Sequence, residues 1–574
     1  MVDRRRLATG VLALCALASV ALMEPALASA RVAYFTGASS SGMGSIAAPV
    51  ELTTQAIGGQ VPIGMSSEGT PADVAITPDG KTAYVVDNEQ VVPIDVATNT
   101  AGTPIAIPIF GQAIAIAPDG RFAYVSSVFV GPSEISKIDL ATKTVVATIA
   151  VGDNAFGLAV TPDSRTLYVA SNGDGSVYPV DVATNVVGAA IPVGPFPSAV
   201  SVTPDGSSAY VLLPGEEKLV RIDLATNTVV GAIANVPGSE LAIAPNGAKA
   251  YAVGGSAITP VDLGSGAAGT TSFAPNQDSF EDVAILPDGS RAYATTQHNE
   301  ASLFTGLMTP VLTAGDALQP SFPLNTSFVG ALAIVPNQPP RAEFSVAPQP
   351  GKAMLPVSFD AAASADTDGG SVVRYDWDFG DGSSAANGGA SPQHTYAQPG
   401  TYTVTLTVTD NEGCSVSMVF PGQTAYCNGS SIARTTRTVV VERNLCPQVK
   451  AGASTFIPKR RPGKVLPGVR VRLSTGVPAR LTVTARLIYR RNGKEASAGL
   501  GTISADVNRW RRVRFAVPPG LRQELPLGKR VKVELRIETA PKGGAPCETT
   551  VVNRTLKVHV VKVFPNRVQA ERPR

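Results

Sequence analysis

The sequence predicts an all-β protein with three successive domains, and three observations favour this fold class. A motif that contains proline recurs at intervals of about 40 residues through the first half of the chain. Alternating apolar and polar residues, which are typical of strands with one buried face, continue in two further segments after the motif stops. The net charge is −16 in residues 31–337, −4 in residues 338–445 and +21 in residues 446–574. An asymmetry of this size indicates separate domains with different partners.

The recurring motif marks seven units of one segment. Its prolines are Pro78, Pro118, Pro162, Pro204, Pro245, Pro287 and Pro336. A tyrosine follows each of the first six prolines after six positions, whereas the seventh proline has none and a spare tyrosine, Tyr34, stands near the start of the segment. We therefore expect the strand at residues 332–335 to pair with the strand at residues 32–35, which closes seven units into a ring without exposed edges. The predicted fold of residues 31–337 is a seven-bladed β-propeller.

Two turns recur in these units. Pro-Asp-Gly joins two strands into a hairpin, because proline presets φ and glycine accepts a positive φ. A second turn, Asp-x-Ala-Thr, recurs at Asp95, Asp139, Asp181 and Asp223, with Asp262 in the looser Asp-Leu-Gly-Ser. Because they recur at the same turn, we interpret these aspartates as acceptors of backbone N–H groups rather than as catalytic or calcium-binding residues.

With these motifs, residues 31–337 resemble the YVTN family of seven-bladed propeller repeats. The pattern Pro-Asp-Gly-x-x-x-Tyr-Val is shared, but the name-giving tetrapeptide reads Tyr-Val-Val-Asp, Tyr-Val-Ser-Ser, Tyr-Val-Ala-Ser and Tyr-Val-Leu-Leu here. The unit at residues 282–330 also lacks the Asp-x-Ala-Thr turn. The resemblance implies an exported surface or binding protein, with lactonase-like or cofactor-dependent enzymes as a minority among similar propellers.

A different pattern begins after Asn337. Residues 338–445 contain Tyr-Asp-Trp-Asp-Phe-Gly-Asp-Gly from residue 375 and Gly-Thr-Tyr-Thr-Val-Thr-Leu-Thr-Val from residue 400. Alternation along the first motif places Trp377 inward and Asp376 and Asp378 outward. These motifs closely resemble those of the PKD domain, an immunoglobulin-like β-sandwich, which implies a spacer or adhesive module of an exported protein.

Residues 364–369 have a spacing that calcium-binding loops use. Asp366 and Asp368, helped by Asp378, would supply hard oxygen ligands. The same Asp-x-Asp-Gly spacing also occurs in ordinary turns, and the twelve-residue loop that ends in glutamate is absent. We expect no cofactor, and calcium at these three aspartates is the alternative.

Residues 446–564 alternate apolar and basic residues and predict a second β-sandwich with a cationic exterior, followed by a disordered tail at residues 565–574. Arg470, Arg472, Arg512 and Arg514 are its candidates for binding anionic envelope polymers or phospholipid headgroups. Two alternatives stay open: docking on the acidic propeller of the same or a neighbouring molecule, and a role in solubility alone. Nucleic acid is disfavoured, because aromatic residues do not interleave with the basic ones.

Four cysteines follow residue 30, and an even number in an exported chain indicates two disulfides. Of three connectivities, we favour Cys414–Cys427, which closes a short loop, and Cys446–Cys547, which ties the two ends of the basic domain. Metal binding is disfavoured, since the chain has no Cys-x-x-Cys and its histidines are not clustered.

The first 30 residues predict an export signal. They combine a basic start, an apolar run at residues 7–22 and a small-x-small site that predicts cleavage after Ala30. Glu24 interrupts the apolar run, which argues against a membrane anchor, and no later segment is long and apolar enough to span a bilayer. We therefore expect a secreted or cell-surface protein without a transmembrane segment.

The residues favour binding over catalysis. The three histidines fall in three different domains, and neither a Gly-x-Ser-x-Gly motif nor a phosphate loop occurs. A site made of carboxylates alone would use Asp73, Glu281 and Asp282, which otherwise are solvated acids near the centre of the ring. The predicted function is an exported binding or adhesion protein that recognises an envelope polysaccharide, another anionic polymer or a protein. The alternative is a propeller hydrolase of lactonase-like type.

Overall fold

The computed structural model describes residues 31–39, 44–64, 71–127, 132–300, 303–444, 450–454, 468–474, 479–492, 494–507, 510–518, 521, 530–541 and 550–559. This part of the chain is all-β, and its three short 3-10 helices are η1 (Pro214–Glu216), η2 (Pro275–Gln277) and η3 (Ser431–Ala433). It divides into two compact units. The first unit holds the described residues up to Arg341 together with Ala365–Val373 and Val408–Ala433, so a part of the predicted second domain packs with the repeats.

The first unit contains seven separate antiparallel sheets. Their first strands are β5 (Asp73–Ile76), β10 (Gly111–Ile116), β14 (Ala155–Val160), β18 (Val200–Val202), β22 (Glu240–Ile243), β27 (Ser279–Ile285) and β32 (Phe328–Ile334). Their second strands are β6 (Thr82–Asp87), β11 (Phe122–Ser127), β15 (Thr166–Ser171), β19 (Ser208–Leu213), β23 (Lys249–Gly254), β28 (Arg291–Glu300) and β1 (Val32–Ala38).

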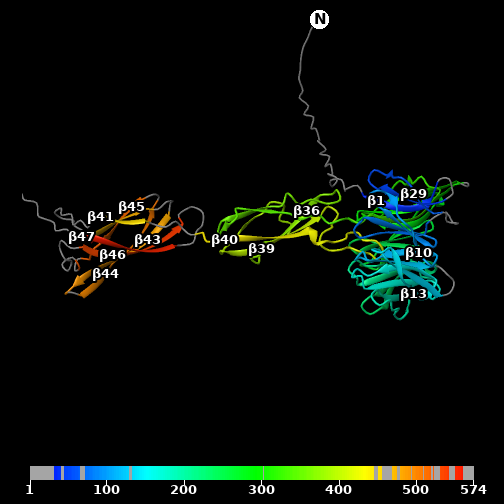
Figure 1. Ribbon diagram of the computed structural model, residues 1–574, viewed down its shortest axis with the longest axis horizontal. Helices are drawn as coiled ribbons and strands as arrows, with labels where there is room; N and C mark the ends of the chain where they lie inside the picture. Colours follow the sequence, from blue (N-terminus) through cyan, green and yellow to red (C-terminus); the bar gives the residue numbers. More distant parts are fainter. Residues whose placement is uncertain are drawn as a thin grey trace, which may run out of the picture. The chain divides into compact units, whose positions relative to one another are not determined.

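Third and outer strands complete each sheet. The third strands are β7 (Gln90–Asp95), β12 (Pro132–Asp139), β16 (Ser176–Asp181), β20 (Lys218–Asp223), β24 (Ala257–Asp262), β29 (Leu303–Leu312) and β2 (Ser45–Glu51). The outer strands are β3 (Ala56–Ile57), β4 (Val61–Gly64), β8 (Thr100–Ala101), β9 (Ile105–Ala106), β13 (Thr144–Asp153), β17 (Ile191–Pro192), β21 (Thr228–Ala234), β25 (Ala267–Ala268), β26 (Ser272–Phe273), β30 (Ala317–Leu318) and β31 (Phe322–Pro323). Figure 1 labels the strands β1, β10, β13 and β29 of these sheets.

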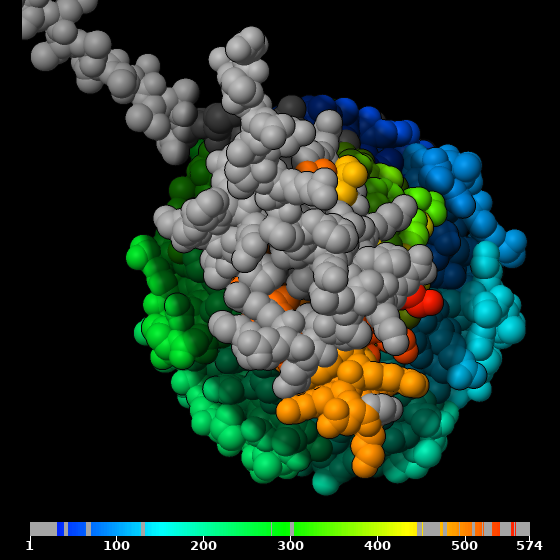
Figure 2. Space-filling model, turned by 90° about the vertical axis from the view of Figure 1, so that its left-hand side faces the viewer, coloured from blue at the N-terminus to red at the C-terminus, as the bar shows by residue number. Residues whose placement is uncertain are grey.

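The two ends of the repeat segment share one sheet. Strand β1 pairs with β32, with Ala33 opposite Ile334 and Phe35 opposite Leu332, so the pairing predicted between these two strands is confirmed. The first strands lie next to one another in chain order, and β32 in turn contacts β5. In Figure 2 the colours of these sheets follow one another around a circular outline, from blue through cyan to green.

The recurring turns have the predicted structural role. Gly80, after the first Pro-Asp pair, has a φ of 68°, and its N–H donates to the Thr77 carbonyl over 2.8 Å. Asp95 accepts hydrogen bonds from the N–H and the hydroxyl of Thr98 over 2.8 and 2.7 Å. These hydrogen bonds lower the pKa of the Asp95 carboxyl, as stabilisation of the charged form requires. Asp139, Asp181, Asp223 and Asp262 accept hydrogen bonds in the same way.

The region resembling a PKD domain consists of two sheets around an aromatic core. One sheet holds β33 (Ser345–Ala347), β35 (Pro356–Asp360) and β38 (Gln393–Thr395), and the other holds β34 (Gly351–Lys352), β36 (Val372–Asp378), β37 (Ser384–Ala385), β39 (Gly400–Asp410) and β40 (Arg434–Glu442). Trp377 is buried and packs on Phe344 and Phe359, whereas Asp378 is exposed, as the alternation predicts.

Two further sheets share the core of the basic region. The strands β41 (Lys450–Ser454), β42 (Gly468–Ser474) and β45 (Trp510–Ala516) form one sheet. The strands β43 (Ala479–Arg491), β44 (Lys494–Val507), β46 (Arg530–Pro541) and β47 (Thr550–His559) form the other. Buried Val471 and Phe515 of the first sheet pack with Leu481 and Val533 of the second. The predicted tail at residues 565–574 lies outside the described residues.

Candidate functional site

The first strands surround a central cavity of about 720 Å³. All seven first strands or the residues just before them contribute to its lining. Three carboxyl groups face it at one repeat position, five residues before the repeat proline: Asp73, Glu240 and Asp282. The other four sheets have alanine or glycine there, at Ala113, Gly157, Ala199 and Ala331. The carboxyls therefore gather on neighbouring strands, β22, β27 and β5, with only β32 between the last two.

Two of these carboxyls connect neighbouring sheets. Asp73 accepts the N–H of Ile114, in the next first strand, over 2.8 Å and the N–H of Val74 over 2.7 Å. Asp282 accepts the N–H of Leu332 and its neighbour's N–H in the same arrangement, both over 2.7 Å. These two side chains therefore stabilise the packing of adjacent sheets besides lining the cavity. No hydrogen bond to the Glu240 carboxyl is found among the described residues.

Burial shifts the titration of all three groups. It raises the pKa of Asp73 to about 8 and that of Asp282 to about 7. The pKa of Glu240 is also raised, first by burial and then by the charges of Asp282 and Asp73. At neutral pH this part of the cavity therefore holds protons that carboxyls in water would have released.

The sequence prediction identified only part of this carboxyl cluster. It named Asp73, Glu281 and Asp282, and all three line the central cavity. Glu281 is exposed, and its carboxylate accepts the Ser279 hydroxyl over 2.5 Å. Glu240 was missed, although its register five residues before Pro245 is the signal that would have identified it.

Residues 421–426 close one end of the central cavity. They hydrogen-bond to five first strands, always at the residue two positions before a repeat proline. Val202, Val160 and Ile116 donate their N–H groups to the carbonyls of Pro421, Gly422 and Gln423 over 2.9, 2.8 and 3.2 Å. Ile76 donates its N–H to the Thr424 hydroxyl over 3.2 Å, and the Tyr426 hydroxyl donates to the Ile243 carbonyl over 2.6 Å.

A small inner cavity of about 70 Å³ lies against this closing segment. Gln423 lines both this cavity and the central cavity, together with Asp73, Glu240 and Asp282. The segment thus forms the floor of the central cavity. The repeat motif carries no signal for where this segment binds, which explains why the sequence did not predict the contact.

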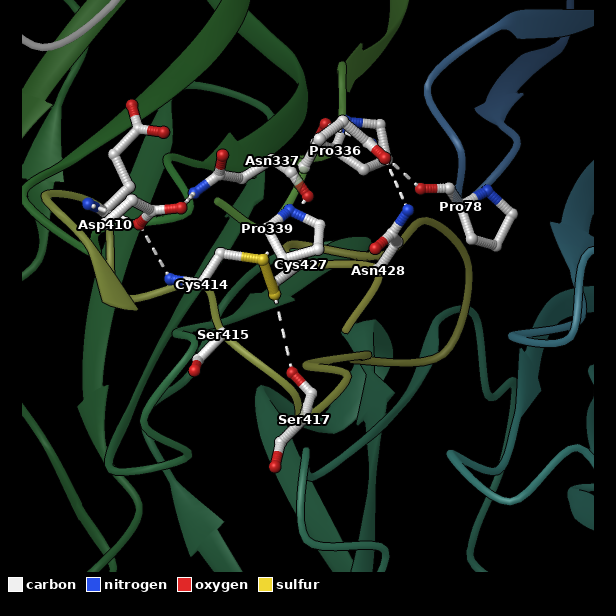
Figure 3. The surroundings of a disulfide bond; sticks show 12 residues. Pro78, Pro336, Asn337, Pro339, Asp410, Cys414, Ser415, Ser417, Cys427 and Asn428 are labelled. Carbon is white, nitrogen blue, oxygen red and sulfur yellow. Dashed lines mark hydrogen bonds between the residues drawn. A yellow bond between two sulfur atoms is a disulfide. The ribbon is translucent and has the colours of Figure 1, made fainter. Parts of the chain in front are cut away.

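A disulfide holds the closing segment (Figure 3). Cys414 and Cys427 are joined, as predicted, with their Cα atoms 5.4 Å apart. Asp410 accepts the N–H of Cys414 over 2.9 Å and the side-chain amide of Asn337 over 3.1 Å. The predicted partners Cys446 and Cys547 lie outside the described residues.

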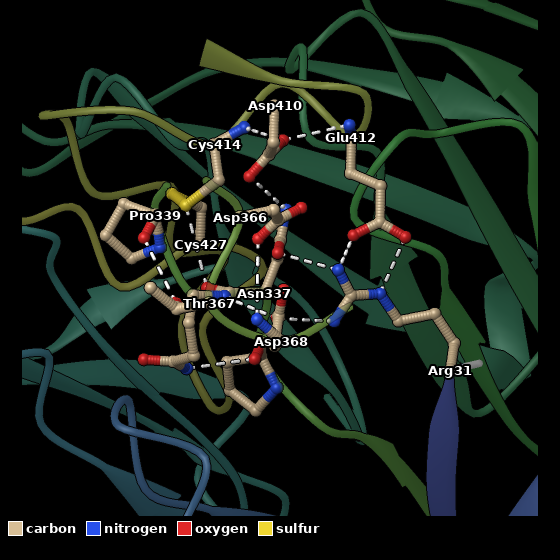
Figure 4. A network of polar contacts seen from close by, with 12 residues as sticks. Arg31, Asn337, Pro339, Asp366, Thr367, Asp368, Asp410, Glu412, Cys414 and Cys427 are labelled. Atoms are coloured by element: carbon tan, nitrogen blue, oxygen red, sulfur yellow. Dashed lines mark hydrogen bonds and ion pairs between the residues drawn. A yellow bond between two sulfur atoms is a disulfide. The ribbon is translucent and has the colours of Figure 1, made fainter. Parts of the chain in front are cut away.

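Two of the three predicted calcium ligands, Asp366 and Asp368, lie beside a buried arginine (Figure 4). Arg31 donates to Glu412 over 2.6 Å, to Asp368 over 3.0 Å and to the Asn337 side chain over 2.6 Å. Asp366 lies next to Asp368, and burial, the hydrogen bond between them and the charge of Asp368 raise the pKa of Asp366 to about 6.

The third predicted calcium ligand has a different role. Asp378 accepts the N–H of Gly380 over 2.9 Å within its own turn. Asp410, rather than Asp378, adds to the charge around Asp366, and its own pKa is raised to about 6, mainly by burial. Among the described residues no group of three or more His, Cys, Asp or Glu side chains is arranged to hold a metal ion. Calcium at Asp366 and Asp368 stays a prediction.

The four candidate arginines meet across two strands. In the pairing of β42 with β45, Arg470 lies opposite Arg514 and Arg472 lies opposite Arg512. The side chains of Arg472, Arg512 and Arg514 are exposed, and the Arg470 side chain is outside the part of the chain that the structure describes. Like charges directly opposite one another are unfavourable in a sheet unless an anion compensates them.

In the other basic sheet, four arginines face acids. Arg486 lies opposite Glu534 and Arg490 opposite Glu495. Arg480 pairs with Asp506, and Arg536 with Glu538, each over 3.0 Å. Within the described strands, β42 and β45 carry arginines and no acids, whereas the other sheet combines such pairs with opposed cations, for example Lys532 opposite Lys557.

Comparison with known proteins identifies one domain. Residues 337–420 match the family model of the PKD domain. The collagenase ColA of Bacillus cereus is 47% identical over 47 residues, which cover 8% of this chain and 5% of that protein. A microbial collagenase of Vibrio alginolyticus is 37% identical over 84 residues (15% and 10%), and the pre-pro-metalloprotease PrtV of Vibrio cholerae is 48% identical over 52 residues (9% and 5%).

These matches are confined to short stretches, since the chain spans only 5–10% of the length of these relatives. Among solved structures, a chain of hydrazine synthase from Kuenenia stuttgartiensis is 28% identical, with 37% of this chain and 65% of that chain covered and a TM-score of 0.34. The described part of the chain is all-β. It contains a PKD domain at residues 337–420. In the described residues, no helix has the length and apolar character needed to cross a membrane.

Proposed function

We propose that this chain is an extracellular binding protein that holds its ligand in the central cavity. In this proposal residues 31–337 are a seven-bladed propeller of the YVTN type, the PKD domain is a spacer and residues 446–564 are an anchoring domain. The pairing of β1 with β32 and the succession of first strands support the propeller. The PKD match, the Cys414–Cys427 disulfide and the predicted signal with cleavage after Ala30 support export.

The central cavity carries the proposal. It is lined from all seven sheets, has residues 421–426 as its floor and is large enough for a small ligand or a peptide side chain. A rigid scaffold with variable loops around such a cavity is the usual placement of recognition residues. An array of glycans and peptides probed with the full chain and with Glu240→Gln tests it. Binding of some array member that the variant weakens is expected, and an array without any such member contradicts the proposal.

Anchoring to anionic polymers is the second part of the proposal. Retention of the full chain on dextran sulfate is expected at 0.1 M salt and release at 1 M, because the Debye length falls from about 10 Å to about 3 Å. Replacing the four opposed arginines (Arg470, Arg472, Arg512 and Arg514) with serine should shift elution to lower salt. The matched control replaces four arginines that face acids: Arg480, Arg486, Arg490 and Arg536. Equal shifts in both variants would show that net charge, rather than the β42–β45 face, retains the chain.

A lactonase-like hydrolase is the second candidate, because the carboxyls of Asp73 and Asp282 hold protons near neutral pH, as general acids do. Turnover of a lactone panel by the purified chain, lost in Glu240→Gln, would favour this activity over simple binding. Binding without turnover would favour the first proposal.

A further inference from the structure

The seven sheets have two chemically different edges. At the turn edge, the first strands end at the repeat prolines and the closing segment binds. At the mouth edge, the first strands begin, and hairpins such as residues 88–89 and 214–217 join second strands to third strands. The central cavity opens at the mouth edge, where its lining includes residues that precede the first strands, among them Pro71, Phe110 and Ser198.

Exposed aromatic side chains collect at the mouth edge. The large aromatic side chains that are exposed among the described residues are five phenylalanines, Phe110, Phe196, Phe273, Phe304 and Phe328, with exposed fractions of 45%, 61%, 66%, 43% and 39%. Phe110 directly precedes β10, Phe328 begins β32, and Phe304 stacks on Phe328 with ring centroids 4.7 Å apart. Phe196 lies in the segment that leads into β18, and Phe273 lies in the outer strand β26, opposite Ala257 at the start of β24.

Basic residues collect at the opposite edge, beside the aspartates of the two recurring turns. Five of them begin or directly precede second strands at the turn edge: Lys81, Arg121, Arg165, Lys249 and Arg291. Lys218, at the start of β20, is at the mouth edge and pairs with Glu216 over 2.7 Å. Acidic residues at the mouth edge outnumber this one basic residue. Besides the three cavity carboxyls, they are Glu89, Asp153, Asp174, Glu216, Glu217 and Glu281.

From this separation we infer that the mouth edge binds a lysine- or arginine-rich segment of a partner protein. The inference rests on the proposed function and names the ligand class of the same cavity. Carboxylates attract ammonium and guanidinium groups, and phenylalanine rings bind the same cations through their faces. The side-chain stems of lysine and arginine cover apolar rings while their charged ends reach the exposed Glu281. A neutral sugar would use the rings but gain nothing from the excess of carboxylates.

The test measures binding of a fluorescent octalysine peptide to the full chain by anisotropy at 50 mM salt. The variant Phe110→Ala/Phe328→Ala should weaken binding about tenfold, since each cation–ring contact contributes up to an order of magnitude when partly desolvated. Glu281→Gln removes one exposed carboxylate and should weaken binding about threefold. The matched controls, Val229→Ala/Val230→Ala on the outer strand β21 and Glu495→Gln on β44, should change binding less than twofold.

The outcomes separate the inference from the proposed function. Equal octalysine binding by all variants, or no binding at all, would overturn the inference. If maltoheptaose binds instead and Phe110→Ala/Phe328→Ala abolishes its binding, the cavity is a ligand site but for a neutral sugar, and only the inference fails. Self-association that both octalysine and the phenylalanine variant abolish would support it, with a second copy of the chain as the partner. Because Glu281 is exposed, its variant keeps the test valid if the double variant does not fold.

Discussion

Single side chains at one repeat position determine the chemistry of the central cavity. Five residues before the repeat proline, the chain has either a small residue or a carboxyl, and Glu240 is the carboxyl that no described hydrogen bond stabilises. Asp73 and Asp282 are held by backbone N–H groups of the neighbouring sheets, which partly offsets the cost of burying them. Glu240 is therefore the group whose charge is least compensated.

At the residue scale, we predict that Glu240→Gln stabilises the chain increasingly as pH rises from 5 to 8. Burial raises the pKa of Glu240 well above its ordinary value of 4.5, so above that pH the folded chain binds this proton more tightly than the unfolded chain does. Stability then falls with rising pH by up to about 1.4 kcal/mol per unit for this group, and glutamine removes that loss. Thermal midpoints of both proteins at pH 5 and pH 8 measure the effect. A constant difference between them at the two pH values would contradict the raised pKa.

The closing segment shows how one loop can be specified by many strands. Its residues 421–424 follow four successive first strands, and each contact uses the backbone N–H two positions before a repeat proline. Each repeat places this N–H at the same position. One short segment can therefore accept a hydrogen bond from each of the four strands in succession. The disulfide between Cys414 and Cys427 restricts the loop to that arrangement.

At the scale of this element, replacing both Cys414 and Cys427 with serine should destabilise the closing segment. A disulfide that closes a loop of 13 residues contributes about 3 kcal/mol by restricting the unfolded chain. We expect faster amide hydrogen exchange at Ile116, Val160 and Val202, which donate to the segment. Amides within the β6–β7 pairing, such as that of Val85, serve as the internal control. Unchanged exchange at the three donors would show that the segment is held without the disulfide.

The whole repeat region depends on a pairing between residues about 300 positions apart. Strand β1 lies between β2 and β32. It therefore joins the start of the repeat segment to its end within one sheet. Its residues Tyr34 and Phe35 are fully buried, so the pairing contributes apolar burial as well as hydrogen bonds.

At this scale, deleting residues 31–38 should cause aggregation, because β2 and β32 would each present an unpaired edge. The matched control begins at Arg31 and keeps β1 intact. Light scattering and thermal unfolding of the two proteins measure the outcome. A soluble deletion variant as stable as its control would show that the region does not depend on this closing strand.

The sequence by itself determined the repeat length, the two turns, the pairing of β1 with β32 and the PKD domain. The turns and strands depend on local signals, namely Pro-Asp-Gly and the alternation of apolar and polar residues. The pairing of β1 with β32 follows because the first unit has the repeat tyrosine but no repeat proline, whereas the last unit has the proline but no tyrosine. The Cys414–Cys427 disulfide followed from the short separation of the two cysteines in the chain.

Only the tertiary structure decided how distant segments meet at the site. Glu240 joins Asp73 and Asp282 because their strands lie close together around one cavity, although more than 160 residues separate the first two carboxyls in the chain. Residues 421–426 directly follow the part of the chain that matches the PKD domain, yet they form the floor of a cavity built by the repeats. Arg31 lies among carboxylates from that same part because its buried charge requires partners there. Such contacts depend on packing between distant segments, and a local residue pattern carries no record of them.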